Sequence, residues 1–225
     1  QPAHQRAGVD AVDRRHPVAA QVGGEVPLGA EVRGGAGELA GDDFADIARW
    51  LQEQSDHYGR SVLQPAALRV APPLATMPPL PPEHPSTLDA ILWSLHLRWW
   101  AWRHDRIDGP KPQVRLFVLF HDPERMSHLP HSTGLNKGRI GVIHAFASRP
   151  QRRQNAVVVA HELLHTFGAS DKYDLTTLQP IYPAGYAEPA LSPRLPQSKA
   201  EIMGGRTPVD ELNAEIPSSL ADIVI

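Results

Sequence analysis

The sequence predicts an α+β fold, because the expected strands and helices follow one another without regular alternation. Apolar residues recur at helical spacing after Asp43 and again after Ser86, which predicts two helices in the first half of the chain. Two runs rich in apolar and β-branched residues, 114–120 and 139–147, are typical of buried strands. A third helix is predicted over 151–167. The order contains no internal repeat and no dinucleotide-binding fingerprint.

Composition narrows the functions open to this chain. It has 225 residues, of which 41% are hydrophobic and 21% charged, as expected for one globular domain with irregular segments attached. The formal net charge of −3 argues against nucleic acid as a partner, because phosphate binding needs a basic surface. No apolar run approaches the roughly 18 residues that cross a membrane as a helix. The absence of cysteine leaves histidine and carboxylates as the strong metal ligands.

The first 110 residues are predicted to hold two helices between irregular segments. Residues 1–41 are rich in glycine, alanine and valine without a sustained period, and are expected to form a poorly ordered extension. The helix after Asp43 is expected to end near Gly59, and a short strand is expected within 63–70. Seven prolines within 72–85 exclude regular structure and predict a stiff connector.

The helix that follows Ser86 has a continuous apolar stripe. Ser86 or Thr87 is expected to cap this helix, which is predicted to end near Gly109. Six large apolar side chains share one face at helical spacing: Leu88, Ile91, Leu92, Leu95, Trp99 and Trp102. We expect this stripe to face the core, because an apolar stripe on a helix usually packs against a neighbouring element.

The predicted helix over 151–167 contains the sequence His161-Glu162-Leu163-Leu164-His165. The i, i+4 spacing places the two imidazoles on one face of the helix, where they can share one metal ion. Glu162 lies on an adjacent flank, where a general base can reach water at the metal without being a ligand. On its own, the five-residue pattern also fits a solvated helical face with two histidines.

Two further residues extend the pattern to H-E-x-x-H-x-x-G-x-x-D. Gly168 can adopt a positive φ and end the helix, so that the chain turns back towards the two histidines. Asp171 then supplies a carboxylate oxygen as a third ligand. Two neutral histidines and one carboxylate leave a fourth position for water, as in a catalytic zinc site. The sequence therefore predicts one Zn²⁺ bound by His161, His165 and Asp171.

The segment 161–171 resembles the metzincin signature of the zincin metallopeptidases, in the variant with aspartate as the third ligand. Its continuation, D-K-Y-D at 171–174, is similar to segments of the snapalysin and immune-inhibitor-A families. Downstream, E-I-M-G-G at 201–205 resembles the Met-turn, which implies that Met203 lies beneath the metal without binding it. One further segment is similar to the edge strand that borders the substrate cleft of matrix metalloproteases, namely Gly141, Val142, Ile143 and His144.

This resemblance implies a zincin-like domain over 42–225, with a small mixed sheet packed on a backing helix and an active-site helix. Within it, 42–110 would hold the N-terminal helices and the proline-rich connector, and 111–171 the sheet and the active-site helix. An irregular C-terminal subdomain with the Met-turn is expected over 172–225. The segment 180–196 matches no peptidase family, which indicates a separate branch. The resemblance also suggests a secreted or cell-envelope location.

Several further side chains are candidates for the same site. Tyr173, Tyr182 and Tyr186 are candidate donors to an oxyanion, with ordinary packing as the alternative for each. Asp174 is expected either to hydrogen-bond a ligand histidine or to cap a turn. His144 is either a contact to the substrate or to a ligand, or a partly buried strand residue. Three further histidines either form a second metal site or belong to a plain surface loop, namely His121, His128 and His131.

The expected reaction is hydrolysis of a peptide bond by a zinc-activated water, with Glu162 as the general base. An extended peptide or protein substrate is expected to pair with the exposed edge of the strand at 139–147. Two alternatives are a zinc hydrolase of a non-peptide amide and a non-catalytic binding domain stabilised by zinc. The presence of Glu162 argues against the non-catalytic domain, because a structural zinc site has no use for a general base.

Overall fold

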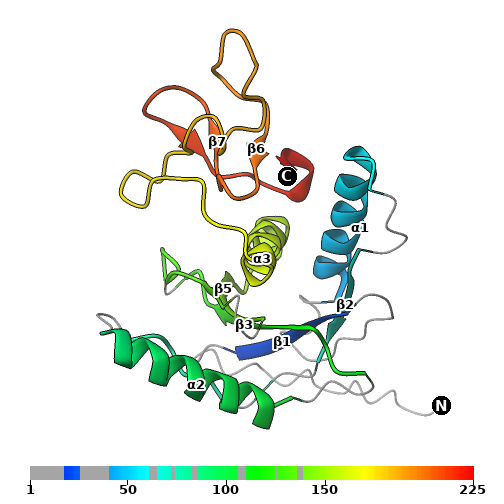
Figure 1. Cartoon of the computed structure of the whole chain (residues 1–225), viewed down its shortest axis with the longest axis vertical. Helices are drawn as coiled ribbons and strands as arrows, with labels where there is room; N and C mark the ends of the chain where they lie inside the picture. Colours follow the sequence, from blue (N-terminus) through cyan, green and yellow to red (C-terminus); the bar gives the residue numbers. More distant parts are fainter. Residues whose placement is uncertain are drawn as a thin grey trace, which may run out of the picture.

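In the computed structural model, a central sheet separates two helical layers, and C-terminal segments lie over one of them (Figure 1). The structure describes residues 18–25, 41–60, 65–71, 74, 76–82, 86–105, 110–124, 126–135 and 139–225. Most of the predicted extension, namely 1–17 and 26–40, therefore lies outside the described residues. So do parts of the proline-rich connector.

The sheet has five strands in the order β2-β1-β3-β5-β4. Their bounds are β1 (Val18–Glu25), β2 (Ala67–Val70), β3 (Val114–His121), β4 (Thr133–Leu135) and β5 (Ile140–Phe146). β1 runs antiparallel to both β2 and β3, β3 and β5 are parallel, and β4 runs antiparallel to β5. This mixed α/β architecture is compatible with the predicted α+β class.

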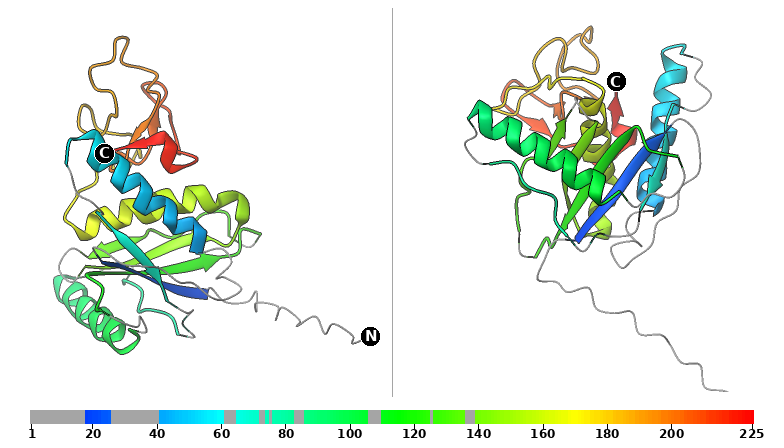
Figure 2. Two further views of the ribbon diagram at one scale, coloured as in Figure 1. Left: turned by 90° about the vertical axis from the view of Figure 1, so that its right-hand side faces the viewer. Right: turned by 60° about the horizontal axis from the view of Figure 1, so that its bottom comes forward.

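The α-helices in the described part of the chain cover both faces of this sheet. They are α1 (Gly41–His57), α2 (Thr87–Arg103) and α3 (Arg152–Thr166), the last preceded by the 3₁₀ turn η2 (Arg149–Gln151). α1 and α3 lie on one face, whereas α2 lies on the opposite face (Figure 2). None of these helices combines the length and the apolar character that a membrane crossing requires.

β3 is buried on both faces and contributes to two hydrophobic cores. Leu116, Val118 and Phe120 belong to the larger core, which α1 and α3 share. Phe117 and Leu119 belong to the smaller core, which the inner side of α2 completes. The alternation follows from the two-residue period of a strand. Because β3 is covered on both sides, it anchors the sheet on which α3 is positioned.

The C-terminal region consists of two-residue strands joined by loops. The pairs are β6 (Ala200–Glu201) with β9 (Ile223–Val224), and β7 (Thr207–Pro208) with β8 (Ala214–Glu215); the 3₁₀ turn η3 (Leu220–Asp222) precedes β9. Trp50 of α1 donates a hydrogen bond from Nε1 to the carbonyl oxygen of Ile223 at 3.2 Å. This bond and the larger core hold the C-terminal region against the helical layer. The irregular character predicted for this region is confirmed.

The helices predicted after Asp43, after Ser86 and over 151–167 are confirmed as α1, α2 and α3. The strands predicted at 114–120 and 139–147 are β3 and β5, and the strand predicted within 63–70 is β2. Ser86 caps α2 as expected, since its hydroxyl oxygen accepts from the backbone N–H of Asp89 at 3.2 Å. The short strand β4 was not predicted, because three residues carry too little periodicity to identify a strand.

The prediction of a poorly ordered extension over 1–41 is wrong for 18–25. This segment forms β1, which lies between β2 and β3 and pairs with both. Its sequence, V-A-A-Q-V-G-G-E, has weak strand propensity and no clear alternation. Strands on both sides supply partners for its backbone, so tertiary pairing outweighs the weak local preference.

The prediction that the apolar stripe of α2 faces the core is also wrong. Every member of the stripe is more than half exposed, from 52% for Ile91 to 73% for Trp102. The inner side of α2 is formed instead by Leu97, Trp100 and Ala101. Because α2 carries large apolar residues around most of its circumference, spacing alone did not identify the side that meets the sheet.

Candidate metal centre

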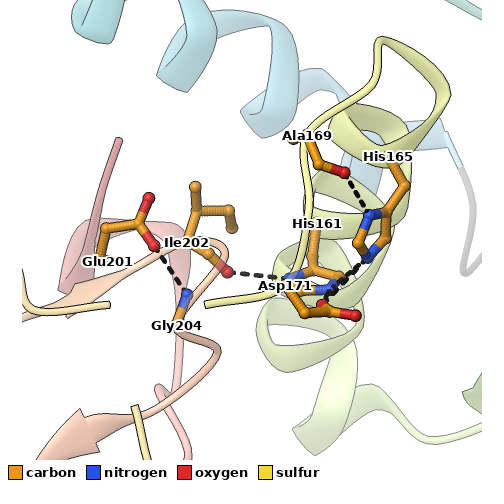
Figure 3. A network of polar contacts seen from close by, with 7 residues as sticks. All are labelled: His161, His165, Ala169, Asp171, Glu201, Ile202 and Gly204. Carbon is orange, nitrogen blue, oxygen red and sulfur yellow. Dashed lines mark hydrogen bonds and ion pairs between the residues drawn. The ribbon is translucent and has the colours of Figure 1, made fainter. Parts of the chain in front are cut away.

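His161 and His165 lie one turn apart on α3 and approach each other closely. Their Nε2 atoms are 3.0 Å apart, and the two rings meet edge to face. Gly168 ends the helix with φ of +97°, and its N–H donates to the carbonyl oxygen of His165. The chain then turns back and brings Asp171 to the histidines, with Oδ1 at 3.2 Å from each Nε2. The three predicted ligands are therefore brought together (Figure 3).

Backbone carbonyls orient both imidazoles. Nδ1 of His161 lies 2.8 Å from the carbonyl oxygen of Ile202, and Nδ1 of His165 lies 2.8 Å from that of Ala169 (Figure 3). Because a carbonyl oxygen only accepts, Nδ1 carries the proton in each ring. In the neutral rings, the Nε2 lone pairs are then directed at the shared point, as in metal sites whose histidines are held from behind.

The separations of these three atoms match the donor set of a zinc site. Zinc ligands in a tetrahedral site lie about 2.0–2.2 Å from the ion and hence on the order of 3.3 Å from one another. The observed separations of 3.0–3.2 Å are close to this value. Two imidazole nitrogens and one carboxylate oxygen are also ligand types that zinc prefers. The residues therefore fit the ion.

Asp171 and His161 shift each other's pKa values. Burial lowers the pKa of His161, but hydrogen bonds to Asp171 and to the Ile202 carbonyl outweigh burial, so the net pKa is raised. When His161 is protonated on both nitrogens, its Nε2 donates to Asp171, and this hydrogen bond holds the pKa of Asp171 below its usual value. The carboxylate is therefore ionised at neutral pH and offers a full negative charge to a cation.

Glu162 is buried beside the two histidines, with 7% of its surface exposed. Its Oε2 atom has no hydrogen-bond partner among the described residues. Burial raises the pKa of Glu162, although the neighbouring histidines work in the opposite direction. A buried carboxylate oxygen without a partner is costly in a folded protein and indicates a site for a ligand, an ion or water.

A cleft of about 280 Å³ opens beside Glu162. Its lining includes Glu162 and His161 from α3, and Arg206 from the C-terminal region. His131 and His144 line it from the side of the sheet. Leucine, proline, valine and isoleucine side chains contribute apolar surface, for example Leu129, Val157 and Ile216. A chain segment with both polar and apolar groups can therefore reach Glu162.

Of the three candidate tyrosines, Tyr173 alone lines this cleft within the described part of the chain. It shares a hydrogen bond with Asp171, and burial raises its pKa to about 12, so the hydroxyl keeps its proton at neutral pH. Tyr182 and Tyr186 pack against each other with ring centres 5.3 Å apart, and Arg194 lies over both rings. For Tyr186, these contacts favour the packing alternative over the role of oxyanion donor.

The turn after β6 braces the histidines from the C-terminal side. Met203 is 2% exposed and belongs to the larger core, and the preceding residue, Ile202, supplies the carbonyl that His161 contacts. Glu201 fixes the turn, since its Oε2 accepts from the N–H of Gly204 at 2.7 Å (Figure 3). Its Oε1 accepts from Nζ of Lys172 at 2.7 Å. Met203 is thus buried in the core directly after the residue whose carbonyl orients His161.

Asp174 caps a turn, and its side-chain hydrogen bonds within the described part of the chain are with Thr176 and Thr177. Its Oδ1 accepts hydrogen bonds from the N–H groups of Thr176 and Thr177. Of the two alternatives for Asp174, the structure shows turn capping. The physical reason is local, because an aspartate next to a turn satisfies the nearest free N–H groups first.

The strand at 139–147 does not offer the free edge that was predicted. Gly141 and Val142 pair with Gly134 and Thr133 of β4, which lies at the end of the strand order. The N–H of His144, further along β5, donates to Oγ of Ser132. Of the predicted edge residues, Gly141, Val142, Ile143 and His144, none lies on the terminal strand. The edge beside α3 is formed by β4 instead.

β4 approaches α3 through a residue without a side chain. A Cβ atom on Gly134 would lie 2.8 Å from Cβ of His165 and 3.2 Å from the carbonyl oxygen of Glu162. A glycine is therefore required where the terminal strand passes the candidate metal ligands. No sequence pattern indicates this role, because it depends on contact between segments about 30 residues apart.

The histidines between β3 and β5 do not form a second metal site in the part of the chain that the structure describes. His121 pairs with His144, with Nε2 of the first 2.8 Å from Nδ1 of the second. His128 contacts Ser127, and His131 lines the cleft. Burial and the neighbouring His121 lower the pKa of His144 to about 4, so this ring is neutral at physiological pH.

No protein-family model, curated protein or solved structure matches the chain. Its function must therefore be inferred from its own residues. The described residues contain one group of three histidine or carboxylate side chains with the spacing of a metal site, and it consists of the ligands predicted from sequence.

The residues that sequence analysis missed act mainly through their backbone. The carbonyls of Ile202 and Ala169 orient the ligands, and Gly134 permits the approach of β4. Arg206 lines the cleft beside Glu162, and so does His131, which sequence analysis had considered only for a second metal site. Only Arg206 had a usable signal, because it follows the predicted Met-turn directly.

Proposed function

We propose that this protein is a zinc-dependent metallopeptidase of the metzincin type, with His161, His165 and Asp171 as ligands. The observation that carries the proposal is the convergence of three ligand atoms within 3.0–3.2 Å, with both Nδ1 atoms engaged by carbonyls. A zinc ion bound there supplies Lewis acidity, which lowers the pKa of water and polarises a substrate carbonyl.

Glu162 is the proposed general base. Its unpartnered Oε2 is available to accept a proton from the attacking water, and the raised pKa makes it a stronger base than an exposed carboxylate. The protonated carboxyl can then pass this proton to the leaving amine. This unpartnered oxygen also argues against a purely structural zinc site, in which Glu162 would be buried at a cost and without use.

Tyr173 is the proposed donor to the oxyanion. Its hydroxyl retains its proton at neutral pH and lies in the cleft next to the proposed ligands. The shared hydrogen bond with Asp171 holds the side chain at the site. A donor positioned before the reaction stabilises negative charge without the cost of reorganisation.

A peptide is the proposed substrate, because a strand edge borders the site. β4 lies at the end of the sheet and passes α3 at Gly134, so an extended chain can add to its outer side.

We also propose a zincin-like fold. In this assignment α1 takes the place of the backing helix, α3 that of the active-site helix, and the turn at Met203 that of the Met-turn. This assignment is supported by the position of α1 and α3 on the same face of the sheet (Figure 2).

Metal analysis and a peptide-library digest test the proposal. We expect about one zinc per purified chain, cleavage of extended peptides, and loss of cleavage with a chelator that is reversed by added zinc. Glu162→Gln is expected to retain zinc and to lower turnover by about 10²- to 10⁴-fold, the usual contribution of a general base.

Glu215→Gln is the matched control, because Glu215 is an exposed acid on β8. It is expected to leave zinc content and turnover unchanged. A chain that binds no zinc would contradict the proposed site. A chain that binds zinc and hydrolyses small amides but no peptide would favour the non-peptide alternative.

A further inference from the structure

The outer side of α2 is an apolar surface that the described residues leave uncovered. We call it the α2 outer face, and it consists of Leu88, Ile91, Leu92, Leu95, Trp99 and Trp102. Each of these side chains is between 52% and 73% exposed. Single exposed apolar residues are ordinary on protein surfaces, but six on one helical face form a contiguous patch.

The size of this patch is close to that of a specific interface. Six side chains of this kind offer on the order of 600 Å² of apolar surface, and two such faces together bury roughly 1,200 Å², the lower end for stable complexes. The spacing is also informative. From Leu88 through Leu92, Leu95, Trp99 and Trp102 the steps are four, three, four and three residues, which is the 3.5-residue repeat of a helix that pairs with another helix.

We propose that the α2 outer face binds the same face of a second copy of this chain, with the two helices antiparallel. An arrangement centred on Leu95 is symmetric, so each copy presents the same surface to the other. Leu88 then lies opposite Trp102 of the second copy, and Ile91 lies opposite Trp99. A smaller side chain thus faces a larger one on either side of the central Leu95 pair, which keeps the distance between the helices even.

Charge complementarity favours the antiparallel direction. Asp89 is exposed near the start of α2, and Arg103 is exposed near its end. The Arg103 guanidinium lies 6.0 Å from the centre of the Trp99 ring, so its charge is at the border of the apolar face. Antiparallel pairing brings Asp89 of each copy near Arg103 of the other, whereas parallel pairing would bring like charges together.

A lipid surface matches this helix less well. Helices that lie on anionic membranes carry rows of lysine and arginine along their polar flanks. Over its 17 residues, α2 has two arginines, Arg98 and Arg103, and no lysine. It also carries Asp89 beside the apolar face. A second copy therefore accounts for both the apolar and the charged residues of this surface.

The inference is independent of the proposed function. α2 lies on the face of the sheet opposite α3 (Figure 2), so pairing through α2 leaves the cleft and the proposed ligands open. A substitution on the α2 outer face is therefore expected to change association without changing zinc content.

Sedimentation equilibrium of the full chain over a wide dilution series tests the pairing. We expect a dimer that dissociates on dilution. Leu95→Glu places two like charges at the centre of the seam and is expected to weaken association by at least about 30-fold, as a central interface residue does. Leu212→Glu is the matched control, because Leu212 is 83% exposed and lies in the C-terminal region. It is expected to leave association unchanged.

The absence of native cysteine allows a test of direction. Leu95→Cys is expected to form a disulfide-linked dimer under mild oxidation, because antiparallel pairing brings the two Leu95 positions close together. Leu88→Cys mixed with Trp102→Cys is expected to cross-link, whereas Leu88→Cys alone and Leu212→Cys are not. A chain that stays monomeric at all concentrations would overturn the proposal. So would a monomer that binds anionic lipid vesicles and loses this binding on Leu95→Glu.

Discussion

α2 and α3 lie on opposite faces of one sheet and show what residue spacing can and cannot determine. On α3, the spacing of His161 and His165 requires that both imidazoles lie on one side, and the structure brings their Nε2 atoms within 3.0 Å. On α2, the spacing of the apolar stripe also defines one side, but this side faces away from the sheet. Spacing therefore identifies residues that share a face, and a further constraint decides where the face points.

That constraint differs between the two helices. On α3, His161, Glu162 and His165 are polar, so the apolar side chains of this helix share the other side, which faces the sheet and α1. On α2, large apolar residues lie on both sides, and shape complementarity selects the inner one. Trp100 meets Phe117 of β3 edge to face at 4.9 Å, and Leu97 is fully buried.

Removing a ligand from α3 gives the largest expected contrast. His161→Ala is expected to lower zinc affinity by more than about 100-fold, since changes that merely reorient a ligand already cost 10- to 100-fold. Zinc titration by competition with a chromophoric chelator measures the affinity. Leu95→Glu on α2 is the comparison and is expected to retain full affinity. Equal loss in both variants would mean that the two helices are not independent.

The inner and outer sides of α2 are distinguished by two leucine truncations. Leu97→Ala is expected to lower the free energy of unfolding by about 2–5 kcal/mol, because it opens a cavity in the smaller core. Leu95→Ala is expected to change it by less than about 0.5 kcal/mol at a dilution where the chain is monomeric. Urea unfolding measures both. Equal losses would mean that the outer side is packed within the monomer.

Sequence analysis identified the helices, the main strands and the three residues that converge as candidate metal ligands, because these depend on local spacing. The chemistry of His161, Glu162, His165 and Asp171 is carried by side chains within 11 consecutive positions. Gly168 also had a local signal, since a glycine after a helix predicts the positive φ that is observed.

The features that escaped prediction depend on contacts between distant segments. β1 is defined by pairing with β2 and β3, and its own residues have little strand propensity. The exposure of the α2 stripe depends on which side of the helix fits β3. Carbonyl oxygens have no sequence signature, so the roles of Ile202 and Ala169 become visible only in the folded chain.

The close approach of β4 provides a smaller test of how α3 is positioned. Gly134→Ala would place a Cβ atom 2.8 Å from Cβ of His165, which cannot move without shifting the helix. We expect a loss of about 1–3 kcal/mol in the free energy of unfolding, as for overpacking, together with weaker zinc binding. Thr133→Ala, at the adjacent position of β4, is the control. Unchanged zinc affinity in Gly134→Ala would show that the site tolerates displacement of His165.

The smallest expected effect on the free energy of unfolding concerns the carboxylate of Asp105, which links the end of α2 to the sheet through Arg115. Asp105 is 3% exposed at its side chain and binds Arg115 of β3 at 2.8 Å and Lys111 at 3.2 Å. Burial works to raise the pKa of Asp105, but its bonds to Arg115 and Lys111 outweigh burial and hold the pKa below its usual value. Folding therefore favours the ionised form.

Asp105→Asn is accordingly expected to lower the free energy of unfolding by about 1 kcal/mol at neutral pH. The sign of the pH dependence follows from the lowered pKa. The stabilising contribution is complete above the unfolded-state pKa of about 4, and it is lost as the pH falls through the lower folded-state pKa. The difference from the wild type should therefore narrow in acid, as measured by urea unfolding at several pH values. Asp46→Asn, which removes an exposed ion pair with Arg49, is the control. If the difference in unfolding free energy between Asp105→Asn and the wild type stays constant with pH, the carboxylate of Asp105 is not the group that holds α2 to β3.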